Sequence, residues 1–101
     1  MGEMDLTVVD DIAKSRFEAR TGDGALAGWV DYTRAPESVT LDHTEVDGAY
    51  EGQGVGSRLV KQTMAIVLAE GVEVVNDCPF IERYMRRHEG EYDAVVRKAG
   101  P

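Results

Sequence analysis

A cluster of three glycines within five residues is the feature of this sequence that most restricts its fold. Gly52, Gly54 and Gly56 lie in the stretch YEGQGVGSRLV, and apolar residues at helical spacing follow directly. Glycine is costly to order and unfavourable inside a helix. The cluster therefore predicts a tight entrance to a helix, where a ligand approaches the backbone closely. The alternative is a turn that needs positive φ, which by itself explains one or two of the glycines.

The residues after the glycines predict one long amphipathic helix. Their apolar positions recur every three or four residues and cover one broad face. These positions are Val55, Leu59, Val60, Thr63, Met64, Ile66, Val67 and Leu68. Gly71 stands where a left-handed C-terminal cap belongs. Pro79 predicts the start of a second helix over residues 80–88, with Phe80, Ile81, Tyr84 and Met85 facing inward.

Strands are expected on both sides of the long helix. Before the glycines, alternation and turn residues predict strands over residues 6–9, 15–20, 25–33 and 38–46. After the helix we expect a short strand over 72–75, buried on both faces, and a last strand over 92–98. This order indicates a mixed α+β or α/β sheet. With 101 residues and no linker, the chain is expected to form one domain over residues 1–101.

The composition limits the partners of the chain. Eleven basic and 19 acidic residues give a net charge of −8, which repels nucleic acids and anionic membranes and attracts amines. The alternative is that the acidity only keeps the protein in solution. One cysteine excludes an internal disulfide, and no apolar stretch reaches the length of a signal or a membrane span. We therefore expect a cytoplasmic protein without nucleic-acid or membrane partners.

The glycine spacing excludes two phosphate-binding motifs. A P-loop needs a lysine directly after its last glycine, and no lysine follows Gly54 or Gly56. The dinucleotide fingerprint needs the spacing G-x-G-x-x-G, which this stretch lacks. What remains is a helix N-terminus with unpaired N–H groups and a partial positive charge, to which a pyrophosphate is well suited.

Three motifs together resemble the GNAT superfamily of N-acetyltransferases. They are His43-Thr-Glu-Val46, the glycine loop, and Asn76-Asp-Cys-Pro-Phe80. This combination resembles the minimal single-domain group of that superfamily, over residues 32–92. The resemblance implies a mostly antiparallel central sheet, splayed between its fourth and fifth strands, with two main helices. It also implies acyl transfer from acetyl-CoA to an amine, with the pantetheine in the split and no metal.

The resemblance also implies the cofactor-binding residues. They are Val46, Glu51, Gly52, Gln53, Gly54, Val55, Gly56 and Ser57. The chain departs from the family signature at Glu51, where arginine or glutamine is usual. A carboxylate near a pyrophosphate is unfavourable unless it points away, so we expect weakened cofactor affinity. A second departure lies at residues 89–91, just after the second helix.

His43 and Glu45 are candidate catalytic bases. Period-2 alternation places them on one face of their strand with Val39 and Leu41, at the end nearest the glycine loop. An amine must lose a proton before it attacks a thioester, which a nearby histidine or glutamate can accept. The alternatives are a structural histidine, and a glutamate that orders the loop or lies on the surface.

Cys78 is the third catalytic candidate. It directly precedes Pro79 at the start of the second helix, whose dipole favours a thiolate, whereas the neighbouring Asp77 opposes it. Three roles stay open: a general acid for the departing CoA thiolate, a transient acyl carrier, or a small buried hydrophobe. Attack by the amine directly on the thioester suits the sequence better than a cysteine carrier, because no histidine neighbours Cys78 in sequence.

Other residues allow two readings. Arg83, Arg86 and Arg87 are either partners of a CoA phosphate or solvated side chains. Trp29 and Tyr32 fall on opposite faces of their strand, and Tyr32 is a candidate flank of an amine site.

Three functions remain in competition. The first is an acetyl-CoA-dependent N-acetyltransferase, acting on a small-molecule or protein amine as a monomer or weak homodimer. The second is a non-catalytic acyl-CoA-binding module, and the third is an interaction domain without a ligand.

Overall fold

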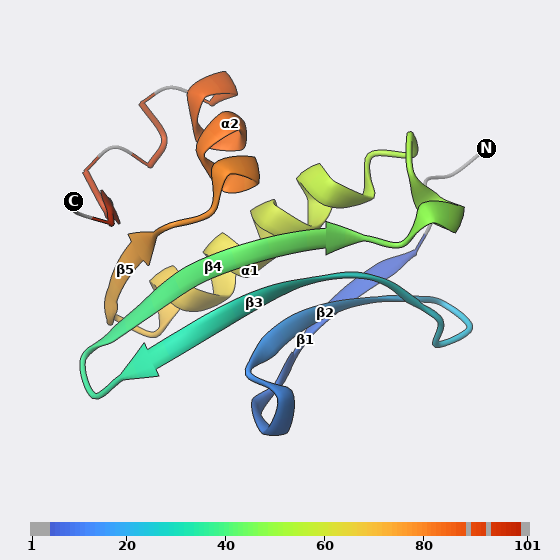
Figure 1. Cartoon of the computed structure of the whole chain (residues 1–101), viewed down its shortest axis with the longest axis horizontal. Coiled ribbons are helices and arrows are strands. Elements are labelled where there is room, and N and C mark those ends of the chain that lie inside the picture. The colour runs from blue at the N-terminus through green and yellow to red at the C-terminus, as the bar shows by residue number, and fades with distance from the viewer. Residues whose placement is uncertain (1–4, 89, 93, 100–101) are drawn as a thin grey trace.

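The protein folds as one six-stranded sheet with two helices, shown in Figure 1. The computed structural model describes residues 5–88, 90–92 and 94–99. The strands are β1 (Leu6–Asp11), β2 (Arg16–Thr21), β3 (Leu26–Ala35), β4 (Ser38–Val46), β5 (Glu73–Asn76) and β6 (Val96–Lys98). The helices are α1 (Val55–Ala69) and α2 (Pro79–Arg87), with short 3₁₀ turns at Ile12–Lys14 and Gly48–Tyr50.

The strands lie in the sheet in the order in which they occur in the chain. Neighbours from β1 to β4 pair antiparallel, whereas β4–β5 and β5–β6 pair parallel. The expected mixed, mostly antiparallel sheet with two main helices is confirmed. The prediction for residues 38–46 matches β4 at both ends. The last strand, β6, is shorter than expected, because it begins at Val96.

The sheet is splayed between β4 and β5, as expected. Their pairing runs from Ser38 opposite Glu73 to Leu41 opposite Asn76, and the Asp77 N–H then donates to the Leu41 carbonyl at 2.9 Å. Beyond that point Pro79 starts α2 and the chain leaves the sheet. Residues 42–46 of β4 continue without β5 beside them, and Figure 1 shows the two strands separating there.

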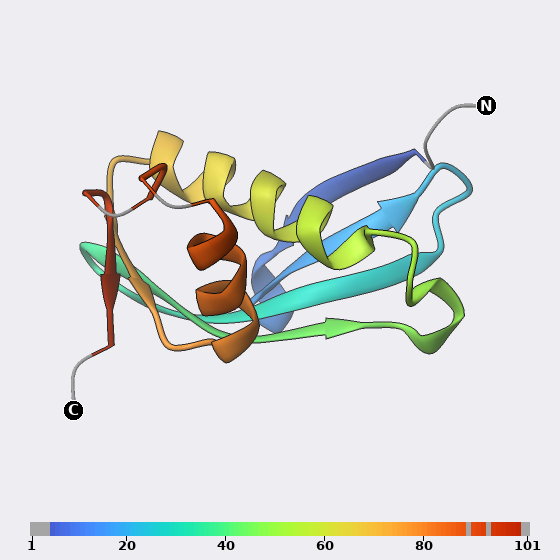
Figure 2. The ribbon, with the colours of Figure 1, turned by 90° about the horizontal axis from the view of Figure 1, so that it is seen from above.

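The helices cover one face of the sheet. In Figure 2 α1 crosses this face, and α2 rises from the end of β5 beside it. The core forms here, around side chains such as Phe17, Leu41, Leu59, Met64 and Ile81. The opposite face of β1–β4 carries no helix in the described part of the chain. The two faces of the sheet therefore have different surroundings, and we call them the covered face and the open face.

A bulge in β4 overturns one expectation about side-chain direction. Asp31 pairs with His43 but the next residue of β3, Tyr32, pairs with Leu41, so Asp42 is an extra residue. An extra residue reverses the alternation beyond it. Leu41 and Thr44 are therefore buried on the covered face, while His43 and Glu45 are exposed on the open face. The prediction that His43 and Glu45 share a face with Val39 and Leu41 was wrong.

The short strand β5 also differs from its prediction. The strand lies at Glu73–Asn76, one residue later than expected, with Val74 and Val75 buried. Glu73 is exposed and forms an ion pair with Arg97 of β6 at 3.1 Å, so the strand is not buried on both faces over its whole length. Residues 1–4 and Glu89, on which two other expectations depend, lie outside the described residues. None of the described helices has the length and apolar character that crossing a membrane requires.

Candidate active site

A cavity of about 320 Å³ lies at the entrance of α1, beside the split in the sheet. It is lined by Val46, Tyr50, Glu51, Gly52, Gly54, Val55, Gly56, Ser57, Phe80 and Arg87. All of the predicted cofactor-binding residues except Gln53 line it. Gln53 instead donates its side-chain amide to the Ala49 carbonyl at 3.3 Å. The structure thus brings the predicted residues together around one hollow, and their binding of a cofactor stays a prediction.

The glycines shape the floor of this cavity. Gly52 and Gly54 have φ of 80° and 77°, in the left-handed region that favours glycine. Gly54 is the N-cap of α1, and no side chain caps the helix; the first helical bond runs from the Arg58 N–H to the Gly54 carbonyl at 3.2 Å. The backbone N–H groups that follow Gly54 have no partner within the helix. They can donate to an anion, and the helix dipole favours a negative charge there.

Gly56 is required for a different reason, which is the close approach of α2. A Cβ atom at this position would lie 2.4 Å from Cζ of Phe80, the second residue of α2. The Phe80 ring therefore packs directly on the first turn of α1. The guanidinium of Arg83 lies over this ring, 5.7 Å from its centroid. The two helices form one wall of the cavity only because residue 56 has no side chain.

Charged groups stand at the rim of the cavity. Glu51 lines it, so the residue that departs from the family signature lies beside the proposed phosphate position. Arg87 lines it too, from the last turn of α2, and takes part in no ion pair among the residues that the structure describes. Arg86 pairs with Glu82 at 2.9 Å. Of the three arginines in the predicted basic patch, Arg87 is the one that lines the cavity, and its contact with a phosphate stays a prediction.

Cys78 lies at the base of the split, on the covered face. It is 2% exposed, and its sulfur lies 3.4 Å from Oγ1 of Thr44 on β4. The buried side chain of Asn76 holds the Cys78 backbone, accepting from its N–H and donating to its carbonyl at 3.1 Å each. Thr44 and Asn76 were missed by the sequence reasoning. Their signal was present, because each belongs to one of the motifs quoted above.

His43 and Glu45 form a pair on the open face. Nε2 of His43 lies 2.8 Å from Oε1 of Glu45, and their side chains are 59% and 50% exposed. Thr44, between them in the chain, points to the covered face and contacts Cys78. The candidate bases and the candidate acid therefore lie on opposite sides of β4, where β4 has no neighbour in β5.

Tyr32 does not flank this pair. It lies on the covered face, 4.9 Å from the Phe17 ring, and donates its hydroxyl to Asp10 at 2.6 Å. Burial and then the Asp10 carboxylate raise the pKa of Tyr32. The aromatic residue near His43 and Glu45 is Trp29, which pairs directly with Glu45 across β3 and β4.

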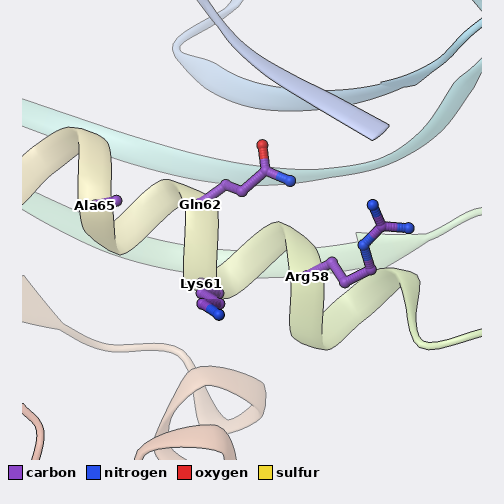
Figure 3. Close-up of a pocket in the computed structure, with 4 residues that line it drawn as sticks. All are labelled: Arg58, Lys61, Gln62 and Ala65. Atoms are coloured by element: carbon purple, nitrogen blue, oxygen red, sulfur yellow. The ribbon is translucent and has the colours of Figure 1, made fainter. Parts of the chain in front are cut away.

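A second hollow, of about 390 Å³, lies on the outer side of α1. Arg58, Lys61, Gln62 and Ala65 line it, and Figure 3 shows these side chains along successive turns of the helix. Gln62 donates its amide to the Leu6 carbonyl at 3.4 Å, which joins α1 to β1. No group of three histidine, cysteine or acidic side chains that can hold a metal is present in the described ranges.

Comparison with known proteins assigns the family. Residues 16–95 match the sequence profile of the GCN5-related N-acetyltransferases. The chain belongs to this family, the GNAT superfamily, and the resemblance of its motifs is confirmed. Protein NATD1 of Xenopus tropicalis is 33% identical over 52 residues, and protein NATD1 of Homo sapiens is 34% identical over 50 residues. These segments cover 52% and 50% of this chain and 48% and 44% of the relatives, so the match spans about half of their length.

Solved structures support the fold. An acetyl transferase-like protein of Pyrococcus furiosus superposes with a TM-score of 0.52 at 22% identity, covering 73% of this chain and 57% of its own. A GCN5-related N-acetyltransferase of Sphaerobacter thermophilus gives a TM-score of 0.51 at 19% identity, covering 77% and 29%. At these identities the likeness extends to the fold alone.

Proposed function

We propose that the protein is an N-acetyltransferase that uses acetyl-CoA and transfers its acetyl group to a primary amine. The observation that carries this proposal is the cavity at the entrance of α1, with the split of the sheet beside it. Family membership supplies the general reaction, whereas the cosubstrate and the acceptor are inferred from the residues of this chain.

The α1 entrance suits the pyrophosphate of CoA. The N–H groups after Gly54 have no helical partners, and Gly52 and Gly54 place no side chain in the way of an approaching phosphate. Arg87 supplies a positive charge from the last turn of α2, which lines the same cavity. These features offset the carboxylate of Glu51, which we expect to weaken the affinity.

The split suits the pantetheine and the thioester. Residues 42–46 of β4 have lost β5 as a neighbour, so the backbone groups on that edge are available to an extended chain. The edge leads from Val46, which lines the cavity, towards Thr44 and Cys78.

In a direct attack, groups on the two faces of β4 carry out different proton transfers. On the open face, His43 accepts a proton from the ammonium or attacking amine, and Glu45 orients its imidazole. The amine nitrogen forms a bond to the acyl carbon, and the bond from that carbon to sulfur breaks. On the covered face, the Cys78 thiol donates a proton to the departing thiolate and regains one from solvent.

A non-catalytic acyl-CoA-binding module is the second candidate. The exposure of both His43 and Glu45 favours it, because a base that stands in water is not held against a substrate. The carboxylate of Glu51 at the rim also suits a site tuned for modest affinity.

The remaining expectations belong to the same proposal. We propose a small-molecule or protein amine as acceptor, no nucleic-acid or membrane partner, a monomer or weak homodimer, and a cytoplasmic location. The net charge of −8 supports the first two, because it attracts amines and repels polyanions.

Melting and product analysis test the proposal together. Acetyl-CoA at about 100 times its dissociation constant should stabilise the protein by about 2.7 kcal/mol, whereas ATP and NAD should not. Release of CoA with a panel of amines, together with the mass of each product, separates the enzyme from the binding module. Binding without amine-dependent CoA release would favour the module, and the absence of any shift or heat with acetyl-CoA would contradict both.

Gly56→Leu supplies the loss-of-binding control. The leucine side chain would clash with the Phe80 ring, so it should disrupt the packing of α2 on α1 that forms the wall of the cavity. Gly48→Ala is the matched glycine variant in the same loop, because a Cβ there meets nothing within 4 Å. The first variant should lose acetyl-CoA binding and the second should retain it.

A further inference from the structure

We propose that the acceptor is an aliphatic polyamine, held on the open face of β3 and β4. This inference rests on the proposed function, because it names the substrate class of the same site. We define the acceptor face as the outward residues Trp29, Asp31 and Thr33 of β3 and Asp42, His43 and Glu45 of β4.

The strand register places these residues beside the candidate bases. Asp31 pairs with His43, and Trp29 pairs with Glu45. Side chains of directly paired residues on one face have Cβ atoms about 5 Å apart. A carboxylate and an aromatic ring therefore stand next to the histidine and glutamate that would receive the reacting amine.

Asp31 is the group of the acceptor face that is free to bind a cation. Glu45 is engaged by His43, and Asp42 accepts from the Thr33 hydroxyl at 2.7 Å. Asp31 makes no side-chain hydrogen bond or ion pair within residues 5–88, 90–92 and 94–99. It lies only partly exposed, directly opposite His43. The Arg16 guanidinium opposite it is engaged by Glu18 at 2.8 Å, so the Asp31 carboxylate is available to an ammonium group of a ligand.

The charge on the acceptor face matches a cation. The face carries the carboxylates of Asp31, Asp42 and Glu45, and Arg16 of β2 is the direct partner of Asp31 across the strands. The nearest arginines, on β2, are held by the buried Glu18, with Arg16 at 2.8 Å and Arg20 at 2.7 Å. A positive charge that approaches His43 is therefore attracted by the carboxylates, and the arginines beside it are partly neutralised.

Trp29 provides the apolar part of the acceptor face. The Arg16 guanidinium, anchored by Glu18, stacks on the ring 4.8 Å from its centroid and fixes its position. The ring lies partly exposed between Glu18 and Glu45 across the strands. Methylene groups can pack along such a ring while the charges at their two ends reach carboxylates.

These features require two amines in one molecule. The reacting amine must reach His43 and lose its proton there, so it cannot also keep an ion pair with Asp31. A second ammonium a short methylene chain away satisfies Asp31 and remains protonated. A monoamine leaves Asp31 without a partner. The acceptor face therefore selects a diamine or longer polyamine over a monoamine of the same size.

Fluorescence of Trp29, the sole tryptophan of the chain, tests this binding without any reaction. We would titrate the protein, without acetyl-CoA, with 1,4-diaminobutane and with butylamine. We expect a saturable change with the diamine that weakens with salt, and a much weaker response with the monoamine. Asp31→Asn should weaken diamine binding about 2- to 5-fold.

Glu37→Gln is the matched control for charge. Glu37 is exposed in the turn between β3 and β4, away from the acceptor face, and the variant removes the same charge as Asp31→Asn. Equal weakening by both variants would show a general attraction to an acidic protein and would overturn the proposal. Unchanged melting temperatures of both variants show that the fold is retained.

Turnover separates this inference from the proposed function. We expect kcat/KM to favour the diamine over butylamine, and Asp31→Asn to reduce that preference by raising KM while kcat changes little. Acetyl transfer with no preference for the diamine would overturn the polyamine proposal and leave the N-acetyltransferase intact. Diamine binding at Trp29 without any transfer would sustain the acceptor face and contradict the enzyme. Transfer only to lysine peptides would overturn the polyamine as occupant.

Discussion

The covered and open faces of the sheet are built in different ways. On the covered face, contacts between elements fix each group: Gly56 against Phe80, and Cys78 against Thr44. On the open face, neighbouring strands align side chains that stand in or near water, such as His43 with Glu45. In the proposed enzyme the first face holds an invariant cosubstrate and the second selects the amine. In this proposal, packing would govern cofactor affinity and strand register would govern the choice of acceptor.

The largest effect is expected on the open face. His43→Ala removes the proposed base, and we expect kcat to fall about 100-fold, near the lower end for general base catalysis. The dissociation constant of acetyl-CoA should not change, because the imidazole lies on the other side of β4 from Cys78. Single-turnover kinetics and calorimetry measure the two quantities separately. A parallel loss of acetyl-CoA affinity would show that the two faces are not independent.

Cys78→Ala should have the next largest effect, from the covered face. If Cys78 donates a proton to the departing thiolate, the rate should fall about 10- to 100-fold and measurable activity should remain. Thr44→Val is the matched variant, because it removes the hydroxyl 3.4 Å from the sulfur and retains the thiol. We expect it to lower the rate less than Cys78→Ala.

The acyl-carrier role makes a different prediction for Cys78. An acetylated protein would accumulate when acetyl-CoA is added without an amine, and Cys78→Ala would abolish transfer. Intact-protein mass spectrometry detects the adduct directly. A stable acetyl adduct that is missing from the alanine variant would overturn direct attack.

The variant Glu18→Gln tests whether the ion pairs of Glu18 with Arg16 and Arg20 stabilise the fold. Burial opposes ionisation of Glu18, but hydrogen bonds and charges from Arg20 and Arg16 outweigh it and lower its pKa below the usual 4.5. A lowered pKa stabilises the folded state above pH 4.5, and this contribution is lost as the pH falls through the lower folded value. Glu18→Gln should therefore cost about 1–2 kcal/mol at pH 7 and flatten the fall in stability below pH 4.5. Denaturant melts at several pH values measure this. If the free energy of unfolding fell equally below pH 4.5 in the variant and in the unchanged protein, Glu18 would not hold the two arginines in solution.

The smallest effect is expected at the rim of the cavity. Glu51→Arg replaces a carboxylate beside the proposed pyrophosphate by a cation and should tighten acetyl-CoA binding by about 1 kcal/mol at low salt. High salt should reduce the gain. Calorimetry at two salt concentrations tests both statements. Unchanged or weaker binding at low salt would mean that Glu51 holds the loop rather than opposes the phosphate.

The two faces also differ in what the sequence predicted. Local sequence patterns were sufficient to predict the helices of the covered face. The glycines, the apolar stripe of α1 and Pro79 each lie within one continuous segment of the chain. They located the entrance of α1 and the start of α2 within one residue, and the family resemblance supplied the set of residues from Val46 to Ser57. Phe80 and Arg87 join the cavity through the packing of α2 on α1, and no local pattern reports that contact.

The direction of the side chains on the open face could not be predicted from one strand, because it depends on the pairing between two strands. A single extra residue, Asp42, reversed the alternation and moved His43 and Glu45 away from Leu41. Strand propensity does not reveal such a bulge, because it arises from pairing with β3. The pairing of Trp29 with Glu45 and of Asp31 with His43 likewise became visible only with the register.

Mapping the amides of the labelled protein by nuclear magnetic resonance during titration with acetyl-CoA is the most direct test of the central claim. The claim is that the α1 entrance and the free edge of β4 bind the cosubstrate. The largest shifts are expected for the N–H groups of residues 52–57 and of Thr44 and Val46, with little change at Glu18 on β2. Shifts confined to the outer side of α1 around Arg58 and Lys61, or no shifts at saturating acetyl-CoA, would contradict it.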